Sequence, residues 1–235
     1  IEAALDAGID FFDTADIYGA ATSESVLGEA LGSRRSEVVI ATKFGLPSAE
    51  RPGGGHPDYV RSSAERSLAE LRTDVIDLYQ FHAPDPSVPL AETLGAMAEL
   101  VAEGKVREIG CSNFDAAQLR AARAIPDVPE LVSVQNQYSL LWREPEAEVL
   151  DALDELGMAL LPYYPLANGL LTGKYLPGEP IAEGTRLGMM PEERKAHWLS
   201  EQLLGVVEDI RAISDDVGIP MAVLAFSWLA SHQQV

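Results

Sequence analysis

The chain has 235 residues, with 37 Asp and Glu against 17 Lys and Arg, so its formal net charge is −20. A charge of that size and sign repels nucleic acid and anionic membranes, and we expect neither as a partner. The single cysteine, Cys111, excludes an intrachain disulfide, so we expect a reduced, cytoplasmic setting in which Cys111 is a buried, inert thiol.

Six apolar, strand-like runs succeed one another, and a helical pattern follows each of them. We predict strands at residues 9–13, 38–43, 76–82, 106–111, 131–135 and 158–163. Their starts are about 25 to 38 residues apart, a spacing typical of βα units. Glycines Gly8, Gly104 and Gly157 precede three of these runs and predict left-handed caps of the preceding helices.

Helices are predicted from apolar residues that recur every three or four positions. Residues 1–6 resemble the last turns of a helix, and the further predicted helices are residues 23–31, 58–71, 90–102, 115–124, 146–156 and 200–217. The apolar run at residues 221–230 is too short to span a bilayer and predicts a buried helix. Residues 165–197 form a long irregular stretch, and loops of that length are usually functional or mobile.

Polar side chains mark the carboxyl ends of the six predicted strands, as Asp13, Lys43, His82, Ser112, Gln135 and Tyr163. Six consecutive strand ends face one pocket only if the strands form a ring, whereas an open doubly wound sheet concentrates its ligand at one switch point. The sequence therefore predicts a TIM (β/α)8 barrel, with residues 1–235 as a single barrel domain.

Four ionisable side chains lie at or just beyond the first three strand ends, namely Asp13, Tyr18, Lys43 and His82. A phenol beside an ammonium can donate a proton to a carbonyl oxygen, because the cation stabilises the phenolate and a carboxylate orients the cation. Hydride transfer to a carbonyl carbon builds negative charge on that oxygen and needs such a donor. These residue types therefore predict a carbonyl reductase.

Short phrases along nearly the whole chain resemble the aldo-keto reductase superfamily in order and spacing. They are Phe12-Asp13-Thr14-Ala15, Tyr18-Gly19, Ala41-Thr42-Lys43, Leu71-Arg72-Thr73-Asp74, Gly104-Lys105-Val106-Arg107, Ser112-Asn113-Phe114, Val134-Gln135-Asn136 and Gly169-Leu170-Leu171-Thr172-Gly173-Lys174-Tyr175. The resemblance implies a (β/α)8 barrel that reduces aldehydes and ketones with a nicotinamide cofactor, usually NADPH, and without a metal.

The resemblance also implies roles for individual residues. Tyr18 would be the general acid, Lys43 the neighbour that lowers its pKa, Asp13 the partner of Lys43, and His82 the residue that orients the substrate carbonyl. Cofactor contacts carried over from the family are Ser112, Asn113 and Gln135 for the carboxamide, Tyr163 for stacking on the nicotinamide, and Leu166, Gly169, Leu171, Gly173 and Lys174 for the pyrophosphate.

Two departures from the family pattern accompany the resemblance. Tyr164 stands where many members have a small Ser beside the pyrophosphate, so that contact would come from backbone alone. Family members also begin with a hairpin and a first strand, and finish with an eighth strand and a phosphate-binding segment. We therefore expect this sequence to be an interior portion of a longer protein, lacking the first and last strands of the barrel.

Alternative interpretations of the same residues remain open at this point. Lys43 could form a Schiff base in an aldolase-type barrel. A cofactor-binding regulatory protein on the same scaffold, resembling potassium channel β subunits, is a second alternative. A metal-dependent hydrolase is disfavoured because His56, His82, His197 and His232 are scattered along the sequence.

Overall fold

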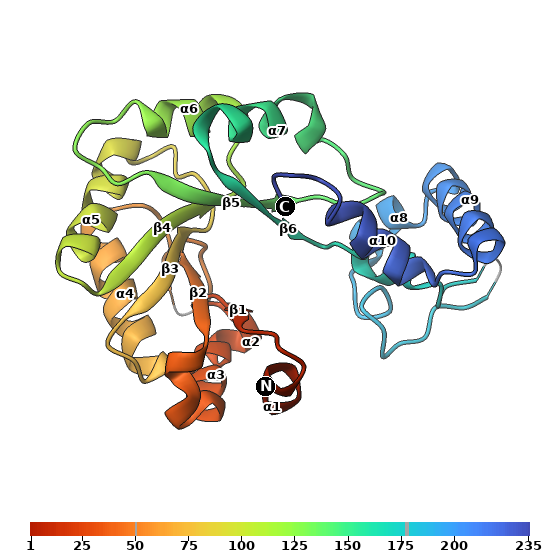
Figure 1. The fold of residues 1–235 in the computed structure, drawn as a ribbon, viewed down its shortest axis with the longest axis horizontal. Coiled ribbons are helices and arrows are strands. Elements are labelled where there is room, and N and C mark those ends of the chain that lie inside the picture. The colour runs from red at the N-terminus through yellow and green to blue at the C-terminus, as the bar shows by residue number, and fades with distance from the viewer. Residues whose placement is uncertain (50, 177–178) are drawn as a thin grey trace. The chain divides into compact units, whose positions relative to one another are not determined.

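The computed structural model describes residues 1–49, 51–176 and 179–235. Within them, six strands form one sheet in the order β1-β2-β3-β4-β5-β6 (Figure 1). The strands are β1 (Phe11–Asp13), β2 (Val39–Phe44), β3 (Ile76–Phe81), β4 (Val106–Ser112), β5 (Leu131–Gln137) and β6 (Ala159–Tyr163). The pairings from β1 to β5 are parallel. An order that never reverses is that of a barrel sheet and has no switch point, so the predicted fold class is confirmed.

The predicted strand positions agree with the observed ones to within two residues. The largest difference at a strand start is in β1, which begins at Phe11 and not at residue 9. Backbone N–H groups explain this shift, because those of Gly8 and Ile9 donate to Leu5 and Ala4 in the preceding helix. Ile9 therefore belongs to the helix end and cannot pair with the sheet.

Helices follow the strands as the sequence predicts, and α3 and α5 have the predicted bounds. The helical elements of the described residues are α1 (Glu2–Asp6), α2 (Tyr18–Ala21), α3 (Ser23–Leu31), η1 (Gly32–Glu37), α4 (Pro57–Leu71), α5 (Leu90–Ala102), α6 (Ala116–Arg123), α7 (Pro145–Leu156), η2 (Ala167–Thr172), α8 (Glu192–Trp198), α9 (Glu201–Val217) and α10 (Met221–Leu229). The prediction that residues 165–197 are irregular is wrong for η2 and α8, which are too short to give a clear apolar period. Residues 177 and 178 of that stretch lie outside the described residues.

The described chain divides into two compact units. Unit 1 consists of residues 1–135 and 152–159, and unit 2 of residues 136–151 and 160–235. That the whole chain forms a single barrel domain stays a prediction. We describe each unit separately below.

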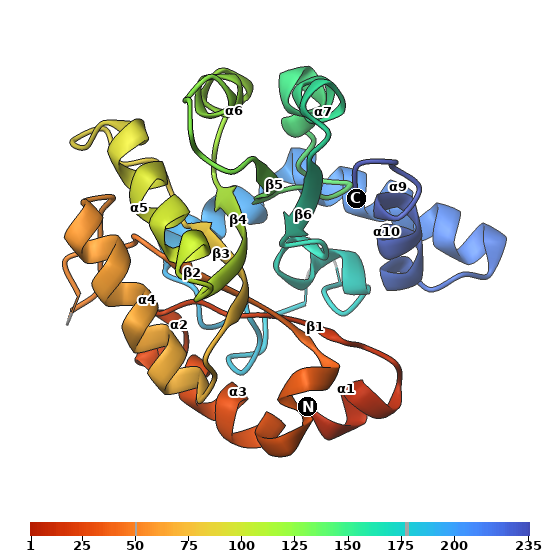
Figure 2. The same ribbon diagram turned by 60° about the vertical axis from the view of Figure 1, so that its left-hand side comes forward.

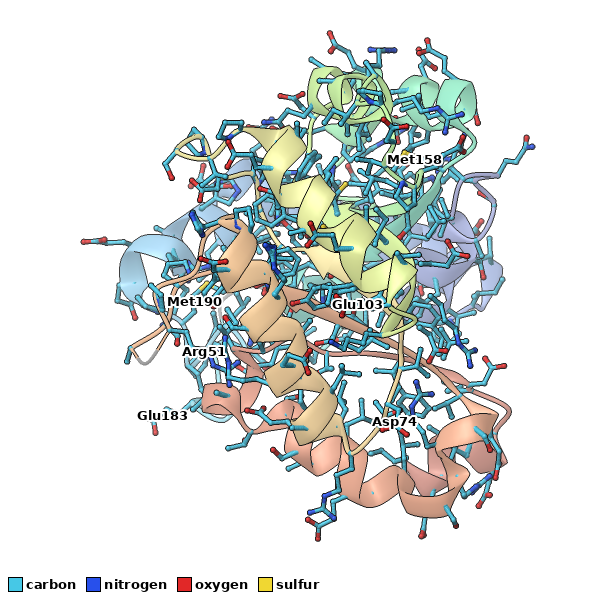
Figure 3. The ribbon with its side chains drawn as sticks, turned by 90° about the vertical axis from the view of Figure 1, so that its left-hand side faces the viewer. Arg51, Asp74, Glu103, Met158, Glu183 and Met190 are labelled. Carbon is cyan, nitrogen blue, oxygen red and sulfur yellow. The ribbon has the colours of Figure 1, made fainter. Side chains whose placement is uncertain are left out.

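The core of unit 1 lies between the sheet and a row of helices. Every residue of β3 is buried, and α3 contacts α4, α4 contacts α5, and α5 contacts α6 (Figure 2). The stick view shows α4 and α5 side by side (Figure 3). Val60, Ala64, Leu68 and Leu71 of α4 are buried, as their spacing indicates. Cys111 on β4 is buried as predicted, and burial raises the pKa of its thiol well above the usual range.

Unit 2 has its own apolar core, formed by η2, α8, α9, α10 and the connecting segments. Its buried members are Ala167, Leu170, Leu171, Leu187, Trp198, Val207, Met221 and Ala225. The prediction of a buried helix at residues 221–230 is wrong for one face of α10, where Val223 and Phe226 are 49% and 50% exposed. This run is apolar on every side, so its composition could not indicate which face packs.

No single helix in residues 1–49, 51–176 and 179–235 is both long enough and apolar enough to cross a membrane. The bent pair of α9 and α10 reaches that length and composition only when both helices are taken together, across an angle of 99°.

Candidate active site

The segment after β1 stays paired with β2 for several residues beyond the end of the strand. The Thr14 N–H donates to the Ala41 carbonyl at 2.8 Å, and the Asp16 N–H donates to the Lys43 carbonyl at 3.0 Å. Asp13, at the end of β1, is thereby held beside the carboxyl end of β2. Tyr18 follows two residues after the last of these bonds.

Lys43 is fully buried, and its ammonium has two partners on the β1 side. Its Nζ donates to Asp13 Oδ2 at 2.5 Å and to the Thr14 carbonyl at 2.8 Å. Burial lowers the pKa of Lys43, while the Asp13 carboxylate opposes that shift by favouring the charged form. The pair therefore places a cation at the sheet end with its direction fixed by Asp13.

The Asp13 carboxylate is itself oriented by two side-chain amides. Its Oδ1 accepts from Gln135 Nε2 at 2.9 Å and from Gln80 Nε2 at 3.3 Å. Gln80 is fully buried on β3, two residues before His82. Sequence reasoning missed Gln80, although strand alternation puts it on the same face of β3 as His82 and could have indicated it.

Tyr18 lies against two of the other three catalytic candidates, Lys43 and His82. The Lys43 Nζ lies over the Tyr18 ring, 4.8 Å from its centroid, and the His82 ring meets that ring edge to face at 5.8 Å. Tyr18 is 37% exposed, whereas Lys43 and His82 are buried beneath it. The structure therefore brings together all four predicted catalytic side chains, with the phenol on the solvent side.

His82 is held through its backbone, and its ring is positioned by packing. Its N–H donates to the Phe44 carbonyl at 2.8 Å, and its own carbonyl accepts from Asn113 Nδ2 at 2.8 Å. Burial and the nearby Lys43 charge lower the pKa of His82 to about 4. The imidazole is then neutral at physiological pH and can donate one N–H to a carbonyl oxygen.

The three residues predicted to hold a carboxamide form one network with this site. Ser112 Oγ donates to the Gln135 carbonyl at 2.7 Å, and Asn113 Nδ2 also lies 3.0 Å from Ser112 Oγ. Asn113 has a positive φ of 61°, a conformation that asparagine tolerates better than most residues. Ser112, Asn113 and Gln135 are thus fixed within unit 1, beside His82 and Asp13.

The remaining predicted cofactor residues belong to unit 2. Tyr163 ends β6 and packs edge to face on Tyr164 at 5.2 Å, and Tyr164 has a left-handed backbone with φ 54°. Leu166 precedes η2, in which the Leu171 side chain is fully buried. The Leu171 side chain therefore packs in the core, and only the backbone of this residue could serve a ligand.

Glycines shape the segment that follows β6. Gly169 and Gly173 have φ of 96° and 79°. A side chain at Gly169 would come within 2.8 Å of Lys174 Cε, so the glycine lets Lys174 fold across this turn. The N–H groups of Gly169 and Leu171 both donate to the Leu166 carbonyl, which leaves them engaged within the segment. Lys174 supplies the positive charge of this segment, and its Nζ lies 5.1 Å from the Tyr175 ring centroid.

Comparisons with known proteins agree with these observations. The family model described as "Aldo/keto reductase family" matches residues 1–235. The chain is 43% identical over 178 residues to a "Probable aldo-keto reductase 1" from Glycine max, which covers 74% of this chain and 51% of that protein. It is 33% identical over 235 residues to "Aldo-keto reductase str7" from Strobilurus tenacellus, covering 99% of this chain and 68% of that protein.

A solved structure of a glycerol dehydrogenase from Gluconobacter oxydans has a TM-score of 0.84 with this chain at 29% identity, covering 100% of this chain and 72% of that one. The chain thus spans about half the length of the Glycine max relative and somewhat more of the other two. Because the family model matches the chain from its first residue to its last, the chain belongs to the aldo/keto reductase family.

Proposed function

We propose that the protein is a nicotinamide-dependent oxidoreductase that reduces aldehyde or ketone carbonyls, with Tyr18 as the general acid. The observation that carries this proposal is the position of the Tyr18 phenol ring against the Lys43 ammonium and the His82 imidazole. A proton donor, a cation and a neutral imidazole meet where a small carbonyl compound can approach from solvent. Family membership supports the same reaction class.

The described residues offer polar groups suited to a nicotinamide cofactor, which would supply the hydride. His82 Nδ1 is buried without a hydrogen-bond partner among the described residues. A buried polar atom of this kind calls for a ligand or water partner. In unit 1, Ser112, Asn113 and Gln135 would hold the carboxamide.

The proton needed by the developing alkoxide would come from Tyr18. A free phenol has a pKa near 10 and is a poor acid at neutral pH. A neighbouring ammonium favours the phenolate, so Lys43 would make proton release easier as charge builds on the substrate oxygen. Asp13 would keep the Lys43 ammonium in place beside the ring, since its carboxylate accepts a hydrogen bond from the Nζ.

His82 would act as a hydrogen-bond donor and not as an acid. With a pKa of about 4, its imidazole stays neutral at pH 7 and carries one N–H. That N–H would orient the carbonyl oxygen toward Tyr18. This assignment separates the two roles, because the phenol gives up a proton and the imidazole only positions the acceptor.

The test replaces Tyr18 by Phe in the intact protein and follows cofactor absorbance with a panel of aldehydes and ketones. Tyr18→Phe should bind the cofactor nearly normally and lose about 100-fold or more in kcat, since general acid catalysis contributes about 10² to 10⁴. Tyr138→Phe, which removes a phenol that donates to Glu146 and has no place among the candidate catalytic or cofactor residues, serves as the matched control and should keep its turnover. Unchanged turnover in Tyr18→Phe would remove this residue from the mechanism.

Two further experiments address the choice of cofactor and the alternative chemistry at Lys43. We propose NADPH as the preferred cofactor, and parallel assays with NADH decide that point. Borohydride should fail to trap a carbonyl compound on Lys43, because its ammonium is committed to Asp13 and the Thr14 carbonyl. A stable borohydride adduct at Lys43 would favour Schiff-base chemistry instead.

A further inference from the structure

A second buried ion-pair cluster, which the proposed mechanism does not use, lies beneath the segment that carries Tyr18. Its centre is Arg51, in the connection between β2 and α4, shown beside α4 in Figure 3. The Arg51 guanidinium donates to the Asp16 carbonyl and to Glu70 Oε1, the latter at 3.0 Å. The same group lies 3.6 Å from Asp16 Oδ2, and the Arg51 side chain is only 10% exposed. One guanidinium thus joins the Tyr18 segment to α4.

Asp16 connects this cluster to the candidate active site. Its N–H donates to the Lys43 carbonyl at 3.0 Å, so its backbone is bonded directly to the residue that carries the catalytic cation. Its side chain is fully buried, and Oδ2 accepts from Ser63 Oγ at 3.1 Å. Burial raises the pKa of Asp16, while Ser63 and Arg51 oppose that shift. Ser63, Arg51 and Arg66 therefore all favour the ionised form of this buried carboxyl group.

The backbone on the other side of Tyr18 is strained. Gly19, Ala20 and Ala21 have φ of 60°, 54° and 64°, and a left-handed conformation in consecutive residues is unfavourable where a Cβ is present. Strain of this kind persists only where the surroundings hold it in place. The Tyr18 phenol is thus set between a strained turn and the bonds made at Asp16.

We propose that Arg51 is a positioning residue, which bridges Asp16 and Glu70 and thereby holds the Tyr18 phenol against Lys43 and His82. The guanidinium suits this task because its planar fork can serve a carbonyl and two carboxylates together, whereas a lysine offers a single point of charge. Among the described residues, the hydrogen bonds and ion pairs of the Arg51 guanidinium go to Asp16 and Glu70. The measurement of turnover in the experiment below rests on the proposed function.

The experiment compares Arg51→Gln, Arg51→Lys and, as a matched control, Arg61→Gln on α4, whose guanidinium pairs with Asp58 and Glu99 at the surface. Two readouts are taken on the intact protein. The first is kcat and KM with the best carbonyl substrate. The second is the NMR signal of ¹³C-labelled tyrosine, assigned to Tyr18 by its absence in Tyr18→Phe, and followed over pH.

Arg51→Gln should lose about 10- to 100-fold in kcat with a smaller change in KM, since misplacing a reacting group by about 1 Å can cost 100-fold. Its Tyr18 signal should shift and titrate at higher pH than in the original protein. Arg51→Lys keeps a positive charge beside Asp16 and should recover part of both losses. Arg61→Gln should leave both readouts unchanged.

Wild-type kcat and an unmoved Tyr18 signal in folded Arg51→Gln and Arg51→Lys would overturn the proposal. If Arg51→Gln does not fold, Arg51→Lys decides alone, and loss of folding in both would also count against a role confined to the Tyr18 segment. If the original protein reduces no carbonyl compound, the proposed function fails, and the Tyr18 signal still decides whether Arg51 positions the phenol.

Discussion

Replacing Glu24 by Gln should stabilise the protein at alkaline pH, because burial disfavours the charged form of this carboxyl group. Glu24 lies on α3 and is 1% exposed. Its Oε1 accepts from Thr42 Oγ1 at 2.6 Å, and its Oε2 has no hydrogen-bond partner among the described residues. Burial is the main cause that raises the pKa of Glu24 to about 7, with smaller contributions from Glu70 and Asp16.

The size and sign of the effect follow from that shift. The pKa rises from 4.5 to about 7 on folding, and each unit corresponds to about 1.4 kcal/mol, so the ionised group costs about 3 kcal/mol. A group whose pKa is higher in the folded state binds its proton more tightly there. Its favourable contribution is therefore complete below pH 4.5, decreases as the pH rises to about 7, and is gone above that value.

The assay is urea unfolding of Glu24→Gln and the original protein between pH 4.5 and 8.5. The glutamine keeps an oxygen for Thr42 and cannot ionise. The gain in unfolding free energy should be near zero at the acid end and reach about 3 kcal/mol above pH 7. Glu29→Gln, exposed on the same helix, is the control and should show no such trend. A Glu24→Gln difference that does not vary with pH would refute the reasoning.

The other predictions concern packing and titration. Gly28→Ala should lower the unfolding free energy by about 1–3 kcal/mol, because its Cβ would meet the Leu71 carbonyl at 2.5 Å. Gly95→Ala, whose Cβ meets nothing within 4 Å, should raise it by up to about 1 kcal/mol in the same urea experiment, and equal effects of the two changes would contradict the packing. Imidazole NMR should find His82 neutral from pH 5.5 to 8, because burial and Lys43 lower its pKa to about 4, and titration near 6.5 would disprove this.

The sheet could be predicted because each buried strand is an apolar run that ends in a polar residue. In β3 this pattern indicated both the strand and the position of His82, and the bounds agree to one residue. Parallel strands share one carboxyl edge, so the relation of Asp13, Lys43 and His82 in space followed from their positions in the sequence. The residue pattern of each strand was therefore enough to predict that these three side chains lie close together.

Other features depend on contacts between distant residues and leave no periodic signal. Arg51 and Asp16 are 35 positions apart, and an arginine in a glycine-rich connection resembles an ordinary solvated charge. The positive φ of Ala20 and Ala21 was equally hidden, because alanine favours right-handed helices. The hydrogen bond between Arg51 and Asp16 and the left-handed turn after Tyr18 become visible only in the structure.

The backbone bonding at the sheet end distinguishes Tyr18 from Lys43 and His82. His82 is tied to Phe44 and Asp16 to Lys43 by backbone hydrogen bonds that continue the parallel pairing past the strands. The backbones of Lys43 and His82 are therefore held by the same kind of bond as the sheet. Tyr18 lies beyond these sheet-type bonds, in a turn where its N–H donates to the Ala15 carbonyl and its carbonyl accepts from the Thr22 N–H, both at 3.1 Å. Substitutions there should change proton transfer more than stability, and substitutions in the sheet should do the reverse.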